Sequence, residues 1–70
     1  MPCYHFKIRN GKFESKDLGV YTLGSDIAAL NFANGVIRDV MHTRPEMYTG
    51  WTLNFMEGTR MVGCLPFGAP

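Results

Sequence analysis

The chain is poor in the residues and motifs that usually indicate a specific chemistry. It has two cysteines, one tryptophan and a formal net charge of only +1. No C-x-x-C pair is present, and Gly19-x₄-Gly24 lacks the Lys-Ser/Thr that a phosphate loop requires. The usual zinc-finger and nucleotide-binding signatures are therefore excluded. The small net charge also gives no general attraction to nucleic acid or to anionic lipid.

Long apolar runs are also missing. The opening segment 1–7 lacks the apolar core of a signal peptide, and no run approaches the ~20 residues needed to span a bilayer. We therefore expect a cytoplasmic protein without a membrane segment, in which Cys3 and Cys64 are free thiols. A chain of 70 residues indicates one domain, residues 1–70, with a thin core that a second subunit could supplement.

The segment from Ser25 to His42 has the periodicity of one long helix. Its apolar residues fall on one broad arc, which suits a helix packed on a sheet: Ala29, Leu30, Phe32, Ala33, Val36, Ile37, Val40 and Met41. Ser25 is the expected N-cap, and Pro45 cannot continue the helix. Gly35 interrupts the polar side at a cost of ~1 kcal/mol relative to alanine, which we interpret as tolerated; close approach of a partner is the alternative.

The N-terminal part predicts a hairpin. Residues 3–9 alternate, with Tyr4, Phe6 and Ile8 on one face. Asn10-Gly11 predicts a two-residue turn that pairs Arg9 with Lys12, Ile8 with Phe13 and Lys7 with Glu14. Segment 17–19 is interpreted as a second turn, and segment 20–23 as an extended lead into the helix.

The C-terminal part predicts a second hairpin. Trp51, Leu53 and Phe55 alternate with polar neighbours to form a strand, after a polar connection over 43–50. A turn at 57–60 leads to a last strand at 61–67 whose register is ambiguous. A two-residue turn would face Val62 and Cys64 inward, whereas a longer or bulged turn would face Met61, Leu65 and Phe67 inward. We favour the second, because leucine and phenylalanine gain more from burial.

Together these segments predict an α+β fold. Four strands form a mainly antiparallel sheet in the order ββαββ along the chain, with one helix packed on one face. The expected core comprises Tyr4, Phe6, Ile8, Leu30, Ala33, Ile37, Trp51, Leu53 and Phe55.

Several short motifs resemble a bacterial family of small cytoplasmic ββαββ domains of unknown function. The shared features are the opening Met1-Pro2-x-Tyr4-x-Phe6, the Asn10-Gly11 turn, Ala28-Ala29 in the helix, Trp51, Gly58 and the terminal Leu65-Pro66-Phe67. At the start of the helix, Gly24 and Ser25 replace the proline and aspartate that are usual in the family. The resemblance implies the fold but no activity.

Candidate reactive groups are few. Cys3 and His5 share one strand face, Cys64 could join them and His42 could supply a fourth metal ligand, but the spacing matches no known zinc signature. Cys3 with His5 also lacks an orienting carboxylate and oxyanion donors. We therefore expect no catalytic residues, no metal and no cofactor, and rank an enzyme last.

Two kinds of function remain. The first hairpin concentrates Lys7, Arg9, Lys12 and Lys16, which leaves a nucleic-acid-associated or antitoxin-like protein as an alternative, although Glu14 and Asp17 interrupt this charge. We favour a non-catalytic module that forms a homodimer, through the sheet face that the helix leaves uncovered or through an edge strand, and binds a protein partner. The expected interaction surface comprises Cys3, His5, Lys7, Arg9, Lys12, Thr52, Asn54 and Met56, with Val62 and Cys64 beside them.

Overall fold

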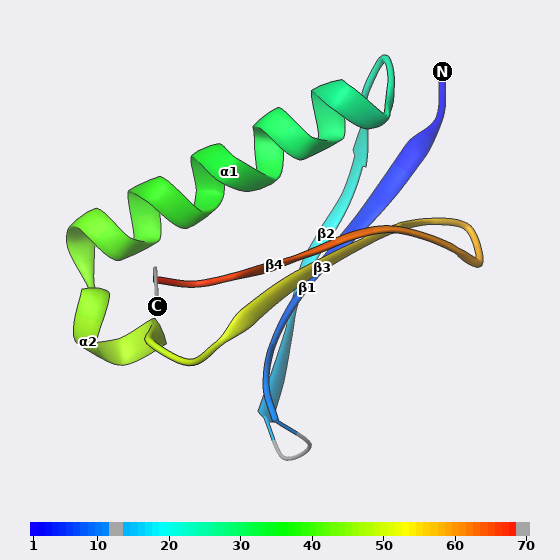
Figure 1. Cartoon of the computed structure of the whole chain (residues 1–70). Helices are drawn as coiled ribbons and strands as arrows, with labels where there is room; N and C mark the ends of the chain where they lie inside the picture. Colours follow the sequence, from blue (N-terminus) through cyan, green and yellow to red (C-terminus); the bar gives the residue numbers. More distant parts are fainter. Residues whose placement is uncertain (12–13, 69–70) are drawn as a thin grey trace.

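A computed structural model of the chain, which describes residues 1–11 and 14–68, shows a four-stranded antiparallel sheet and one long helix. The strands are β1 (Cys3–Asn10), β2 (Glu14–Thr22), β3 (Thr52–Glu57) and β4 (Arg60–Pro66), in the spatial order β2-β1-β3-β4. The helices are α1 (Asp26–Thr43) and a single turn, α2 (Pro45–Tyr48). The fold is therefore the predicted α+β arrangement, with α1 lying along one side of the sheet (Figure 1).

The core lies between α1 and the sheet face that it covers. Ala29 and Ala33 present the narrow side of the helix to the sheet, which lets the two layers approach closely. Phe6 occupies the centre, with its ring centroid 5.4 Å from that of Phe55 and 4.9 Å from that of Phe32. Among residues 1–11 and 14–68, the buried apolar residues are Tyr4, Phe6, Ile8, Ala29, Ala33, Leu53, Phe55 and Phe67.

Most of the predicted core is confirmed, with one error. Ile37 and Trp51, which we also predicted in the core, are only partly buried and pack against it. Leu30, which we predicted to be buried, is 39% exposed. It lies about 100° around the helix from Ala29, so that it falls at the side of the sheet-facing stripe.

The register of the first hairpin differs from the prediction. Asn10 pairs with Glu14, Ile8 with Lys16 and Lys7 with Asp17, a shift of three positions. Residues 14–17 are all polar, so sliding this part of β2 changes little apolar burial and the sequence specifies its register weakly. The pairings predicted for Lys12 and Phe13 lie outside the described residues.

The predicted turn at 17–19 is also wrong, because β2 continues through it with a β-bulge. Phe6 pairs with Gly19 whereas Lys7 pairs with Asp17, so Leu18 is the extra residue. Gly19 has φ +103°, a left-handed conformation that other residues adopt only with strain. The Asp17 carboxylate accepts the Gly19 N–H at 2.7 Å. Turn chemistry is therefore present, but it bends a strand instead of ending it.

The second hairpin combines both of the alternatives considered for its register. Its turn has two residues, since Glu57 pairs with Arg60, but a bulge follows at Val62. The bulge restores the favoured facing for the end of β4, so that Leu65 pairs with Leu53 and Phe67 is buried. Met61, predicted to point inward, instead pairs with Met56 on the opposite face. Val62, expected beside the uncovered face, packs against the core.

The helix begins and ends close to the predicted residues. The Ser25 hydroxyl accepts the Ala28 N–H at 3.2 Å, which confirms the N-cap. At the other end, Arg44 donates its N–H to the Val40 carbonyl, and Pro45 then starts α2, which the sequence did not predict. Within residues 1–11 and 14–68, no helix combines the length and the apolar character needed to cross a bilayer.

Candidate interaction surface

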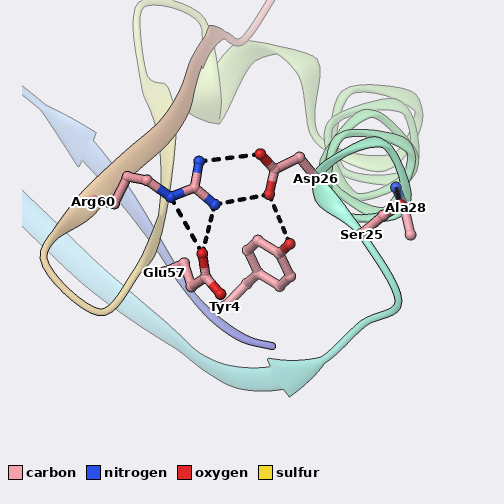
Figure 2. Close-up of polar contacts among 6 residues, drawn as sticks. All are labelled: Tyr4, Ser25, Asp26, Ala28, Glu57 and Arg60. Carbon is pink, nitrogen blue, oxygen red and sulfur yellow. Dashed lines mark hydrogen bonds and ion pairs between the residues drawn. The ribbon is translucent and has the colours of Figure 1, made fainter. Parts of the chain in front are cut away.

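One group of polar side chains links α1 to the sheet, and we call it the latch: Tyr4, Asp26, Glu57 and Arg60 (Figure 2). The Arg60 guanidinium donates two hydrogen bonds to Asp26, at 3.1 and 2.9 Å, and also binds Glu57. The Tyr4 hydroxyl donates to Asp26 at 2.7 Å. The latch therefore joins the first residue of α1 to β1 and to the turn between β3 and β4.

The electrostatics of the latch follow from these contacts. Hydrogen bonds from Arg60, and then from Tyr4, hold the pKa of Asp26 below its usual range. Burial, followed by the hydrogen bond to Asp26, raises the pKa of Tyr4 to about 12. The two carboxylates raise the pKa of Arg60, which stays charged in any case. Each group therefore holds its ordinary charge state more firmly at neutral pH.

The latch has the character of a structural network and not of a catalytic site. Perturbed pKa values can mark functional sites, but ion-pair networks perturb them too. Tyr4 and Arg60 direct their donors at Asp26 and Glu57, within the latch itself. The concavities of about 410 and 320 Å³ lie at the other end of α1, around Thr43 and Arg44. The latch therefore fixes the helix on the sheet.

The sheet face opposite α1, here called the outer face, is the main candidate for a functional surface. Strand pairing arranges its side chains in rows across the four strands, in the order β2, β1, β3, β4. The first row is Val20, His5, Met56 and Met61; the second is Asp17, Lys7, Asn54 and Cys64; the third is Ser15, Arg9, Thr52 and Pro66.

The first row carries the apolar part of this surface. Val20 on β2 is 62% exposed, and Met61 on β4 is 53% exposed. Between them, His5 and Met56 line a shallow depression of about 60 Å³ together with Lys7, Asn54 and Gly58. Apolar side chains thus lie at both edges of the sheet and on β3, with the His5 imidazole and a small hollow between them, which is the form of a contact surface.

His5 is held in this row by Asp17. Its Nε2 lies 2.7 Å from the Asp17 Oδ1. The same carboxylate accepts the N–H of Gly19, on the other side of the bulge at Leu18. The hydrogen bond with His5, and to a lesser extent the one from Gly19, holds the pKa of Asp17 below its usual range. The carboxylate is therefore ionised at neutral pH and keeps the imidazole ring turned toward β2.

The structure places most of the predicted surface residues together. Cys3, His5, Lys7 and Arg9 lie on the outer side of β1, and Thr52, Asn54 and Met56 on that of β3. Lys12 lies outside the described residues. Their role in an interaction stays a prediction.

Five residues of these rows were not predicted: Ser15, Asp17, Val20, Met61 and Pro66. The Gly19 signal that suggested a turn is compatible with a bulge, and this alternative would have carried the strand through Asp17 and Val20. For Met61, no local signal distinguishes a plain hairpin from one with a bulge at Val62.

The groups considered for a metal or nucleophilic site are dispersed. Cys3 and Cys64 are both free and exposed. The Cys3 Sγ contacts the Thr22 Oγ1 at 3.5 Å, and His5 binds Asp17. Cys64 lies on the edge strand β4, where it pairs with Asn54 of β3. Among residues 1–11 and 14–68, no three histidine, cysteine or acidic side chains cluster closely enough to hold a metal ion.

Comparison of the chain with family models, with curated proteins and with solved structures finds no match. The resemblance to small bacterial ββαββ domains therefore stays a prediction, and the arguments that follow rest on the geometry of the chain itself.

Proposed function

We propose that this protein is a non-catalytic interaction module that works as a homodimer formed through its outer face. The observation that carries the proposal is the first row, in which Val20, Met56 and Met61 place apolar side chains on three of the four strands, on the face that α1 does not cover. The dimer then presents its remaining surface, including the end of the β1–β2 hairpin, to a protein partner.

The features of the two edge strands favour a dimer formed through the outer face over one formed by pairing of edge strands. Each edge strand contains a bulge, at Leu18 in β2 and at Val62 in β4. β2 also carries Glu14, Lys16 and Asp17, and β4 ends with Pro66. Bulges, charges and proline are the features by which edge strands avoid pairing with other chains. On the outer face, the β3 and β4 positions of the three rows carry no bulge-flanking charge of this kind: they hold Thr52, Asn54, Met56, Met61, Cys64 and Pro66.

The arrangement of the basic residues in the first hairpin supports nucleic-acid binding less well than it supports a protein interaction. Lys7 and Arg9 lie on the outer face, whereas Lys16 pairs with Ile8 and lies on the inner face. The acidic Asp17 lies next to Lys7 in the second row. Nucleic-acid grooves combine a continuous basic track with stacking aromatics, and the aromatic residues of β1 are buried in the core.

Two matched methionine substitutions test the proposal. Met61 on the outer face and Met47 on α2 are similarly exposed, at 53% and 59%. We expect the unmodified chain to be a dimer by light scattering at micromolar concentration. Met61→Lys should shift it toward monomer, because it places a charge in the apolar contact. Met47→Lys adds the same charge elsewhere and should leave the dimer intact.

Circular dichroism would show that both variants keep their helix content. A monomeric unmodified chain at all concentrations tested would refute the homodimer, and equal behaviour of the two variants would refute the outer face as its location.

A further inference from the structure

The outer face is divided into a charged half and an uncharged half. Its acidic and basic side chains in the three rows lie on β2 and β1: Asp17, His5, Lys7 and Arg9. The positions on β3 and β4 in the same three rows hold no acidic or basic residue: Thr52, Asn54, Met56, Met61, Cys64 and Pro66. The boundary between the halves runs parallel to the strands, between β1 and β3, where the small depression also lies.

This division restricts how two copies can stack. A two-fold axis across the strands would place each strand over its own copy in the reverse direction, so that the basic side chains of β1, Lys7 and Arg9 among them, would lie over the basic side chains of β1 in the second copy. Like charges brought together in an interface are strongly unfavourable. A two-fold axis along the strands instead places β1 over β3 of the second copy, and β2 over β4. Charged positions then meet uncharged ones throughout.

From this charge pattern, and resting on the homodimer proposed above, we infer that two copies stack outer face to outer face about a two-fold axis that runs along the strands, between β1 and β3. Val20 of each copy then lies over Met61 of the other, and His5 over Met56. Lys7 faces Asn54 and Arg9 faces Thr52, whose oxygens can accept hydrogen bonds from the two cations. Stacked sheets commonly keep their strands within about 30° of parallel, which this axis allows.

The pairing of Val20 with Met61 gives a direct test by cross-linking. Within one chain these residues lie on opposite edge strands, three strand spacings or about 14 Å apart. Between copies they face each other across the interface. In a Cys3→Ser/Cys64→Ser background, a Val20→Cys/Met61→Cys variant treated with a bis-maleimide of two-carbon spacer should form a covalent dimer. Mass spectrometry of the digested product should place the link between positions 20 and 61.

The single variants serve as controls. Val20→Cys alone and Met61→Cys alone should remain uncross-linked, and mixing the two single variants should restore the link. Efficient linking of Met61→Cys to itself would overturn the inference, because it would place the two β4 strands together. Absence of the 20–61 link in a variant that light scattering shows to be dimeric would also overturn it. A monomeric unmodified chain would instead overturn the homodimer itself.

A second measurement does not depend on chemical linking. In the inferred dimer Cys64 lies over Asp17 of the other copy, whereas within one chain the two are on opposite edge strands. Cys64→Lys should tighten the dimer, and Cys64→Glu should weaken it, by about tenfold in dissociation constant each, since two such contacts form per dimer. In an Asp17→Lys background the sign of the effect should reverse, because position 17 is then positive. The Asp17→Lys/Cys64→Glu double variant should therefore have a lower dissociation constant than Asp17→Lys alone. Equal dissociation constants for the lysine and glutamate variants would contradict the orientation.

Discussion

Gly63 lies opposite Phe55 in the β3–β4 pair, and its lack of a side chain makes room for the phenylalanine ring. A Cβ atom at Gly63 would lie 2.6 and 2.8 Å from two carbons of that ring. Phe55 is buried and stacks on Phe6, so the ring cannot move without disturbing the centre of the core. We predict that Gly63→Ala lowers the free energy of unfolding by about 1–3 kcal/mol, measured by urea denaturation.

Gly35 in α1 provides the opposite control. A Cβ atom there would meet no neighbouring heavy atom within 4 Å beyond the nearby helix backbone. Gly35→Ala should therefore raise the free energy of unfolding by about 1 kcal/mol, through helix propensity alone. Equal effects of the two substitutions would show that the contact between Gly63 and Phe55 is not as close as described.

Tyr4 makes stability depend on pH in the alkaline range. Its pKa is about 12 in the folded chain, whereas a tyrosine in an unfolded chain has a pKa of about 10. A raised folded pKa means that the neutral phenol stabilises the fold below pH 10 or so, and that this contribution is lost as the pH rises from about 10 toward 12.

The Tyr4→Phe variant isolates this effect, since phenylalanine has no proton to lose. We predict that the free energy of unfolding falls less steeply for the variant than for the unmodified chain above pH ~10, measured by denaturation at a series of pH values. Parallel pH profiles would contradict the raised pKa.

At the scale of the helix and the sheet, two leucines that we predicted to be core residues differ in their burial. Leu53 on β3 is fully buried beneath α1, whereas Leu30 on α1 is 39% exposed. We predict that Leu53→Ala costs about 2–5 kcal/mol of stability, because it removes core contacts and leaves a cavity. Leu30→Ala should cost about 1 kcal/mol or less. Thermal or urea unfolding of both variants gives the comparison, and similar losses would place Leu30 in the core.

The elements that the sequence predicted well are those specified by a local period. Alternation placed the outer and inner faces of β1 and β3 correctly, and the helical repeat with the Ser25 cap placed α1 to within a residue. These patterns depend only on neighbours along the chain. The same alternation is why seven of the eight predicted surface residues lie together on the outer face.

The features that escaped prediction depend on residues far apart in the sequence. The bulge at Val62 accompanies the pairing of Gly63 with Phe55 across β3 and β4. The latch joins Tyr4, Asp26 and Arg60 from three separate elements. The charged half of the outer face required the bulge at Leu18, which brings Asp17 beside Lys7. None of these leaves a periodic signal, so a single sequence does not specify them.

At the scale of the whole molecule, dimer formation should be visible in the chemistry of Cys64. This thiol is exposed in the single chain but lies in the second row of the outer face, which the inferred dimer covers. In a Cys3→Ser variant we predict that the rate of alkylation of Cys64 falls as the protein concentration rises through the dissociation constant. Adding Met61→Lys should abolish this dependence. A rate that is independent of concentration in the dimeric protein would exclude Cys64 from the interface.

The position of β1 has a consequence for how the protein is made. This strand is synthesised before the other three strands of the sheet but lies in its middle, between β2 and β3. Its pairing with β2 can form early, whereas its other side must wait until residues 52–57 have been synthesised. During that interval the nascent chain holds Phe6 and Ile8 on a strand with an open edge, which is the state most prone to mispairing with other chains. The rate at which β3 and β4 arrive therefore sets how long each new molecule remains open to aggregation.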